Sequence, residues 1–382
     1  MTPRRRFAFA LFYFWYYAAL GAFTPYVGRW VSALGHGGFV VGAMLGIWYA
    51  TRVIAPPAWT SFTTRSARPG MWLVAGCAFG LLCFAVFTLT HTAIALLSTM
   101  ALFGFFYNAV LPQFEAMTLT ALGPDTHDYG RIRLWGSIGF LFVAGSYGAL
   151  LDRFGDATFP WLSLPLLVAA LAATWLHRDD QPAAQVATVA DAGHLWKRPG
   201  VRRFLLVAML AQAGFGTFYV FYTLHLQAHH HDGLHVGILW AIGVLAEIVM
   251  FWFVPGLIAR VGASRLLGIC LAVGTVRWAV TAFFAGSFAM MALAQLTHAL
   301  SFAVFQACLM QLMASYFPGR RAAVGQSLLY GFRPGVRGVL GAAVAAVLWH
   351  YGRGEWAFLG GSALTALAWV IYMLRRRTAV AA

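Results

Sequence analysis

Long apolar runs separated by short polar stretches dominate the 382-residue chain. A helix that crosses a membrane needs about 20 consecutive apolar residues. Twelve runs of about this length occur, at residues 7–30, 38–59, 71–90, 92–115, 130–151, 157–176, 201–227, 234–255, 265–285, 287–314, 322–349 and 356–374. The pattern therefore predicts an all-α membrane protein with twelve transmembrane helices.

The twelve runs divide into two groups of six. A polar stretch separates the groups, so we expect an N-terminal bundle at 1–177, a cytoplasmic linker at 178–199 and a C-terminal bundle at 200–382. A shift of 195 residues aligns the two halves without gaps, and the identities include Gly21 with Gly216 and Phe23 with Phe218. We therefore expect two pseudo-symmetric halves, and this same-direction repeat resembles the architecture of the major facilitator superfamily.

Composition excludes several classes of protein. Hydrophobic residues make up 61% of the chain and charged residues 10%, against about 45–50% and 25% in soluble domains. A soluble enzyme, a disordered chain and a nucleic-acid-binding protein are therefore not expected. We also expect no cofactor and no catalytic residues, because no nucleophile–base pair stands out.

The excess of positive charge is sorted by position. Lys and Arg number 26 against 11 Asp and Glu. If the helices alternate in direction, most of the arginines at or beyond the ends of the runs fall on one side, and the exceptions are Arg29, Arg153 and Arg353. The positive-inside rule then places both termini and the linker in the cytoplasm of a cell with a bacterial-type inner membrane.

Ionisable residues inside apolar runs are the candidates for function. Each costs at least about 2.5–3.5 kcal/mol at the membrane centre, so each is expected to face a cavity or a partner. The set comprises Arg52, Glu115, Arg133, Glu247, Arg277, His298, Arg333 and Arg337. These residues therefore define the expected site.

Four of these charges share one depth. Arg52, Glu247, Arg277 and Arg333 each lie 12 or 13 residues from an arginine at the cytoplasmic end of their helix. This separation is about 18–20 Å along a helix. We expect the four to meet across a central cavity, with an ion pair between Glu247 and Arg277. That pair either only joins two helices or also takes part in substrate or proton coupling.

The signs of the buried charges are unequal. Five arginines stand against the two glutamates in the spans. A dry cavity does not keep such an excess unpaired, and the guanidinium fork matches a carboxylate. An anionic substrate is therefore expected. The alternative is that Arg333 and Arg337, four residues apart, face a wet cytoplasmic vestibule.

Two segments resemble the sugar-site hairpin of lactose permease. They are Asn108-Ala109…Pro112…Glu115 and the run YGRIRLWGS at 129–137. The resemblance implies that Glu115 and Arg133 contact the substrate, and that Arg277 and His298 stand at proton-coupling positions. The chain departs from that family at Ser301, where the permease has its coupling glutamate.

The phenylpropionate permease branch of the superfamily is a nearer match. Its members are similar at 129–137, in Gly243-Val244-Leu245-Ala246-Glu247 and in Val276-Arg277-Trp278, and they carry an arginine at the position of Arg52. This resemblance implies proton-driven uptake of small aromatic carboxylates across the inner membrane.

These observations predict a secondary active transporter, a proton-coupled symporter for a small organic anion. The expected substrate-binding residues are Arg133, Glu115, Asn108, Arg52 and Trp135. The expected proton-coupling residues are Glu247, Arg277 and His298, and the other cavity charges are Arg333 and Arg337. The alternatives are an exporter of drugs or metabolites and a sugar or nucleoside symporter, while a receptor or scaffold that transports nothing is disfavoured.

The expected partners are the substrate, protons and the lipid bilayer, with a monomer as the default of the superfamily. No metal site is predicted. The four cysteines lie in apolar runs without metal-type spacing, and the histidines at 229–235 are expected to form a solvated loop.

Overall fold

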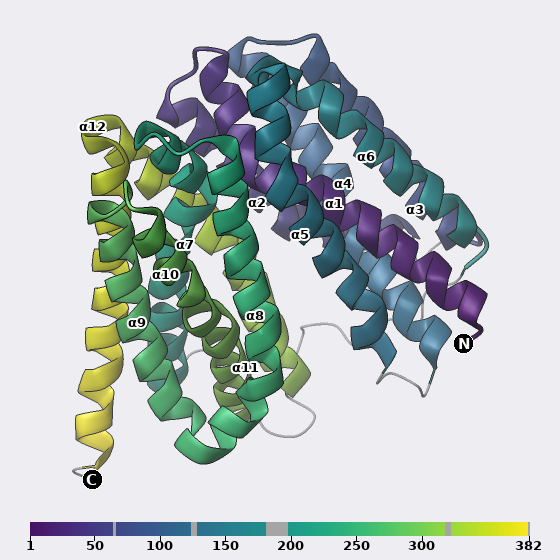
Figure 1. Cartoon of the computed structure of the whole chain (residues 1–382). Coiled ribbons are helices and arrows are strands. Elements are labelled where there is room, and N and C mark those ends of the chain that lie inside the picture. Colours follow the sequence, from purple (N-terminus) through teal and green to yellow (C-terminus); the bar gives the residue numbers. More distant parts are fainter. Residues whose placement is uncertain (64–65, 124–127, 181–197, 318–321, 381–382) are drawn as a thin grey trace. The chain divides into compact units, whose positions relative to one another are not determined.

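The computed structural model describes residues 1–63, 66–123, 128–180, 198–317 and 322–380, and side chains within these ranges except those of 322–337 and 375–380. Helices and short connections make up these residues (Figure 1). The chain divides into two compact units. Unit 1 comprises Met1–Val186 and Asp232–Ile238, and unit 2 comprises Ala187–His231 and Leu239–Ala382.

Six long helical stretches build most of unit 1. They are α1 (Pro3–Ala33), α2 (Gly38–Thr63), α3 (Pro69–Ala85) with η1 (Val86–Thr88), α4 (Ala93–Leu122), α5 (Tyr129–Phe154), and α6 (Phe159–Thr174) between η3 (Asp156–Thr158) and η4 (Trp175–His177). Local signals set some of the ends. Thr2 caps α1 by accepting a hydrogen bond from the Arg5 backbone N–H, and Gly155 ends α5 with a φ of +87°.

Unit 2 holds the remaining helices, except that the first residues of α8, up to Ile238, belong to unit 1. They are α7 (Pro199–Ala228), α8 (Gly233–Val261), α9 (Ala263–Phe283), α10 (Phe288–Leu296), η7 (Ala299–Val304), α11 (Phe305–Tyr316) and α12 (Ala322–Val380). The element η7 is a π-helix, so α10, η7 and α11 form one span with a widened turn in its middle. Such turns are rare and occur frequently at functional sites.

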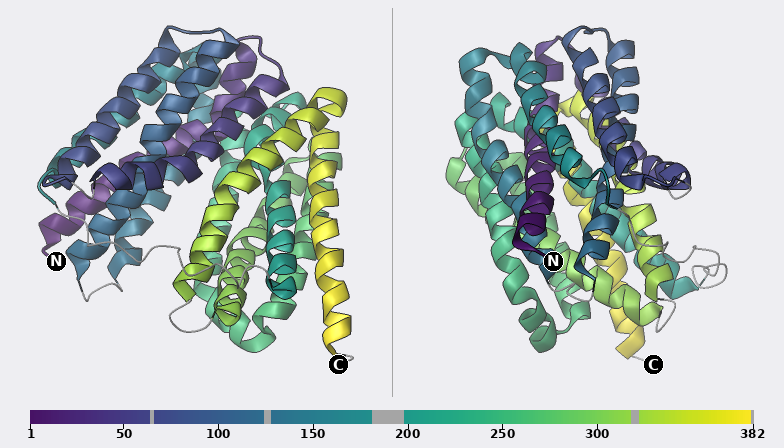
Figure 2. Two further views of the ribbon diagram at one scale, coloured as in Figure 1. Left: turned by 180° about the vertical axis from the view of Figure 1, so that it is seen from behind. Right: turned by 90° about the vertical axis from the view of Figure 1, so that its right-hand side faces the viewer.

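The predicted spans are confirmed. Eleven helices among the described residues are long and apolar enough to cross a membrane. The eleventh, Gly338–Leu374, contains non-helical backbone at Gly352 and Arg353. Figure 2 shows the chain turning back at this break, so that the two segments of α12 run in opposite directions. The break thus separates the two runs expected at 322–349 and 356–374. The boundaries proposed for the bundles and the linker stay a prediction, and 181–197 lie outside the described residues.

Packing within each unit is simple. In unit 1, α1 packs mainly on α5 and α6, α2 packs on α4, and α3 packs on α4 and α6. In unit 2, α12 packs on α7 and α9. Large buried side chains fill these contacts, including Trp30, Trp48 and Trp278.

Glycines allow the backbones of two helix pairs to touch. A Cβ atom at Gly139 of α5 would overlap the carbonyl oxygen of Phe14 in α1, and one at Gly21 would lie 2.7 Å from the carbonyl oxygen of Phe140. In unit 2, a Cβ at Gly216 of α7 would lie 2.5 Å from the carbonyl carbon of Gly341 in α12. Small residues support such close crossings in membranes, where packing drives helix association. Gly21 and Gly216 are a pair that the 195-residue shift aligns.

Candidate functional site

Arg52 is held between α2 and α4 of unit 1. Its Nε–H donates to Oδ1 of Asn108 at 3.3 Å. Asn108 is buried, and its amide donates to the carbonyl oxygen of Trp48 at 3.2 Å and to Oγ1 of Thr51 at 3.0 Å. The oxygen of the Asn108 amide accepts from Arg52 and the nitrogen donates to α2, so Asn108 holds Arg52 close to α2, the helix that carries it.

Arg133 of α5 lies against aromatic rings of α1. Its guanidinium carbon is 3.8 Å from the ring centroid of Tyr17 and 5.5 Å from that of Tyr13. A partly desolvated cation–π contact contributes up to about 2 kcal/mol. The Glu115 carboxylate of α4 interacts with the charge of Arg133 and with the hydroxyl of Tyr129. The rings therefore hold the guanidinium within electrostatic range of a carboxylate but, in the described residues, without an ion pair to it.

Tyr17 connects these two parts. Its hydroxyl interacts electrostatically with Arg133, Glu115 and Arg52. Asn108 and Glu115 are seven residues apart on α4, which places them two turns apart on one face of the helix. The structure thus brings together four of the predicted substrate residues, Arg52, Asn108, Glu115 and Arg133. We call these four residues and Tyr17 the unit 1 cluster.

Trp135 does not join the unit 1 cluster. It follows Arg133 by two residues on α5, so its side chain leaves the helix about 200° away. The side chain is 49% exposed, as expected for a residue that faces lipid. Its assignment to substrate binding stays a prediction that none of these contacts supports.

Among the arginines predicted for the site whose side chains the structure describes, Arg277 of α9 is the most deeply buried. Its Nε–H donates to the carbonyl oxygen of Ala294 at 3.0 Å, and its terminal nitrogens donate to Oε1 of Gln295 at 3.1 Å and Oγ of Ser301 at 3.3 Å. The guanidinium carbon also lies 4.3 Å from the ring centroid of Trp278. Neutral groups thus satisfy a charge that is 3% exposed.

The predicted ion pair between Glu247 and Arg277 is replaced by other contacts. Among the described residues, all polar partners of Arg277 are neutral. Glu247 of α8 instead places Oε2 3.8 Å from Nε2 of His298. Equal depth along two helices does not fix the direction in which each side chain points, and Arg277 points toward the span of α10 and η7.

His298 stands where that span changes geometry. It directly precedes η7 and its ring stacks on Phe302 at 5.1 Å between centroids. Its Nδ1 is buried without a hydrogen-bond partner among the described residues. Ser301 lies within η7, so the widened turn carries one hydrogen-bond acceptor of Arg277 and directly follows His298. We call Glu247, Arg277, Gln295, His298 and Ser301 the unit 2 cluster.

The sequence reasoning did not find every member of these clusters. Tyr17 and Gln295 are not among the residues predicted for the site. A tyrosine inside an apolar run does not stand out in the sequence as a charged residue does. Gln295 could have been found, because it is a polar residue three positions before His298 in the same run. The side chains of Arg333 and Arg337 lie outside the described residues.

Comparisons with known proteins agree with this architecture. A model of the MFS_1 like family matches residues 7–360. The chain is 29% identical over 278 residues to a probable 3-phenylpropionic acid transporter of Escherichia coli (strain K12), which covers 71% of this chain and 72% of that protein. It is 28% identical over 280 residues to a maltose permease of Geobacillus stearothermophilus, with 72% and 70% covered.

Solved structures share the fold. The nucleoside transporter NupG superposes with a TM-score of 0.87 at 17% identity, covering 97% of this chain and 98% of that chain. A bacterial homologue of the human lysosomal transporter Spinster, in an inward-facing and occupied conformation, gives 0.73 at 14% identity, with 99% and 98% covered. The expected resemblance is thereby confirmed, and the chain belongs to the MFS_1 like family of the major facilitator superfamily of membrane transporters.

Proposed function

We propose that this transporter is a proton-coupled symporter that imports a small organic anion, such as an aromatic carboxylate, by alternating access. One observation carries the proposal. The guanidinium groups of Arg52 and Arg133 contact aromatic rings and the neutral Asn108, and within the described residues neither has a carboxylate at ion-pairing distance. A carboxylate ligand supplies the missing partner.

The surroundings of Arg133 suit an aromatic carboxylate in particular. The guanidinium fork offers two parallel donors to a carboxylate, which a lysine does not. The rings of Tyr13 and Tyr17 provide flat apolar surface beside this fork. In this proposal Glu115 orients Arg133, and Asn108 holds Arg52 as a second positive group. The Escherichia coli relative is a probable 3-phenylpropionic acid transporter, which points to the same class of substrate.

The unit 2 cluster suits the proton-coupling role. A carboxylate and an imidazole 3.8 Å apart share a proton more readily than either group holds one alone in a membrane. The unpartnered Nδ1 of His298 gives that proton a second position. Arg277 stays fully hydrogen-bonded nearby and keeps the local potential positive. In this proposal Glu247 is the proton carrier and His298 is its partner.

The sidedness of the protein belongs to the same proposal. The arginines at the helix ends favour cytoplasmic termini in an inner membrane, where the proton gradient drives solute inward. A single chain carries both clusters, so a monomer suffices for the cycle.

The experiment is uptake of labelled 3-phenylpropionate into proteoliposomes with an imposed pH gradient, with and without an uncoupler. Arg133→Ala is compared with Arg131→Ala, because Arg131 is on the same helix but has an 84% exposed side chain. Truncating one partner of a buried charge pair costs about 2–5 kcal/mol, so KM is expected to rise about 30-fold or more. Arg131→Ala is expected to transport normally.

The proton arm uses the same vesicles. Glu247→Gln is expected to abolish gradient-driven accumulation while retaining exchange of labelled for unlabelled substrate, and the exposed Asp179→Asn serves as the control. Wild-type uptake that is unchanged by the uncoupler refutes proton coupling. Uptake of maltose or a nucleoside instead of phenylpropionate, or export from loaded vesicles, replaces the proposed substrate or direction with one of the alternatives.

A further inference from the structure

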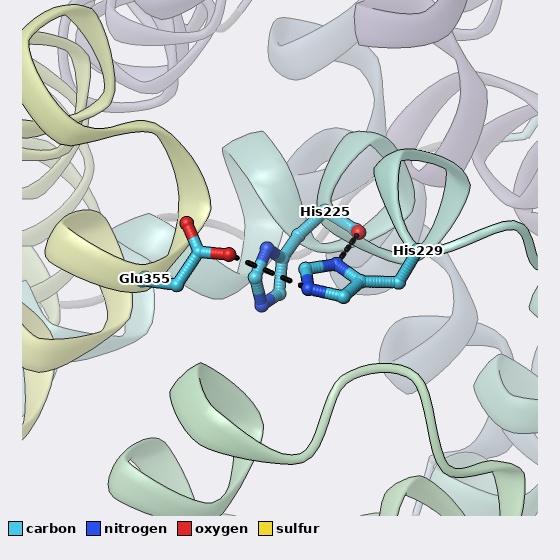
Figure 3. A group of neighbouring side chains, drawn as sticks. All are labelled: His225, His229 and Glu355. Atoms are coloured by element: carbon cyan, nitrogen blue, oxygen red, sulfur yellow. Dashed lines mark hydrogen bonds and ion pairs between the residues drawn. The ribbon is translucent and has the colours of Figure 1, made fainter.

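Three metal-ligating side chains that belong to neither cluster meet within unit 2. His225 and His229 are four residues apart near the C-terminal end of α7, and Glu355 follows the break in α12 (Figure 3). One ligand atom from each residue lies within 4.8 Å of the others. Their spacing along the chain gives no sign of this group, since Glu355 lies more than a hundred residues after the histidines.

Backbone carbonyls fix the tautomers of both imidazoles. Nε2 of His225 is 3.0 Å from the carbonyl oxygen of Thr281, and Nδ1 of His229 is 2.9 Å from the carbonyl oxygen of His225. A carbonyl oxygen only accepts, so each of these ring nitrogens carries its proton and donates. The neutral rings then present lone pairs at Nδ1 of His225 and Nε2 of His229. Metal-binding histidines are oriented by the same kind of outer hydrogen bond.

The lone pair of His229 faces the Glu355 carboxylate. Nε2 of His229 and Oε1 of Glu355 are 3.4 Å apart, and Figure 3 shows the carboxylate directed at the imidazoles. Two acceptors at this distance repel each other unless a cation lies between them. Ligands of a tetrahedral zinc ion, each at about 2.0–2.1 Å from the metal, stand about 3.3 Å apart. The observed spacing therefore fits a metal ion without rearrangement of this pair.

The third ligand stands against a glycine. Residue 354 is a glycine, and a Cβ atom there would overlap Nδ1 of His225. Any side chain at residue 354 would cover Nδ1, so a glycine is needed there to leave this nitrogen accessible. His225 is buried, whereas the side chains of His229 and Glu355 are 30% and 42% exposed, so an ion reaches the group from solvent.

We propose that His225, His229 and Glu355 form a binding site for a divalent first-row transition metal ion, with Zn²⁺ as the best match. Two imidazoles and one carboxylate make a three-ligand set that leaves a fourth position for water. The bound ion connects the end of α7 to the second segment of α12. It therefore braces the segment that follows the non-helical residues Gly352 and Arg353.

The test is isothermal titration calorimetry of the full-length chain in detergent, freed of metal and of any affinity tag, with Zn²⁺ as the probe. The wild type is expected to bind one Zn²⁺ per chain in the presence of excess Mg²⁺, which prefers all-oxygen ligands. His229→Ala and Glu355→Gln are expected to weaken binding by about 100-fold or more, since losing even an outer-shell partner costs about 10–100-fold. His235→Ala, in the first turn of α8, is the matched histidine control and is expected to bind normally.

Two further measurements separate the explanations. Zn²⁺ is expected to raise the Tm of the wild type and not of Glu355→Gln, because the ion binds only the folded chain. Gly354→Ala is expected to abolish binding although it removes no ligand. A wild type that binds no Zn²⁺ refutes the site and leaves a proton between His229 and Glu355. Binding that survives in Glu355→Gln but fails in His235→Ala also refutes it and assigns the ion to a site that includes His235.

Discussion

The contact between α1 and α5 gives a sharp test of the packing in unit 1. At Gly139 a Cβ atom would overlap a backbone oxygen of Phe14, which cannot rotate away as a side chain does. A Cβ atom essentially never lies closer than 3.0 Å to such a neighbour, so Gly139→Ala must push the two helices apart by on the order of 1 Å. The buried hydrogen bond from the Tyr26 hydroxyl to the carbonyl oxygen of Ala144, 2.7 Å long, spans the same contact and would lengthen.

The magnitude follows from two opposing effects. Overpacking of a tight contact costs about 1–3 kcal/mol. A helix-interior glycine replaced by alanine gains about 1 kcal/mol in helix propensity. Gly46 of α2 isolates the second effect, because a Cβ atom there has nothing within 4 Å. Gly139→Ala is therefore expected to be less stable than Gly46→Ala by about 1–3 kcal/mol.

The assay is thermal unfolding of both variants in the same detergent, read from the fraction that stays monodisperse. A difference of about 1–3 kcal/mol corresponds to a Tm lower by about 2–12 °C, with the scale for soluble domains of similar size. Equal Tm values for the two variants would mean that α1 and α5 separate without cost, and the packing argument would be wrong.

Two further predictions rest on features outside this contact. Gly136→Ala is expected to keep the Tm within a few degrees but to raise KM for the substrate. The added Cβ would lie 2.7 Å from the Tyr17 ring and 2.8 Å from Nη1 of Arg133, and both groups can move to make room. An unchanged KM would show that Tyr17 is not part of the site. Asp180 lies just beyond η4, where burial alone would raise its pKa, but the hydrogen bond from His177 and the charge of Arg5 outweigh burial and hold that pKa below 3.8. The ionised carboxylate thus stabilises the fold fully above pH 3.8, and this contribution disappears as the pH falls through the lower folded value. Asp180→Asn is expected to lose about 0.2–1 kcal/mol at pH 7 and to lose less than the wild type on acidification, whereas identical Tm-against-pH curves would contradict the assignment.

Much of the fold could be predicted from the sequence because the membrane imposes a strong length rule. The ends of the apolar runs differ from the helix ends by a few residues, and α4 continues from the predicted 115 to Leu122. A helix extends beyond the membrane interior wherever the backbone keeps its bonds, and hydropathy does not record this. The sequence also predicted two separate spans where the structure has α12, because the apolar runs stop and restart there. In the structure only two non-helical residues separate these two segments.

The candidate site could be predicted only in part. Residue types and depth identified Arg52, Glu115 and Arg133, since a charge in an apolar run is conspicuous. Direction around the helix was missing, so Glu247 was paired with Arg277 although its carboxylate lies beside His298. The widened turn at η7 has no marker in the sequence, and the direction of each side chain around it follows from that turn.

The backbone contacts at the glycines also bear on the mechanics of transport. Helices that touch through long side chains can slide, because rotamers rearrange between them. Gly139 and Gly216 leave no side chain at their crossings, so sliding there strains main-chain atoms directly. Each of the pairs α1–α5 and α7–α12 should therefore move as a rigid unit. The bending that a transport cycle requires must then occur in more flexible segments, such as the π-helical turn at Ala299–Val304.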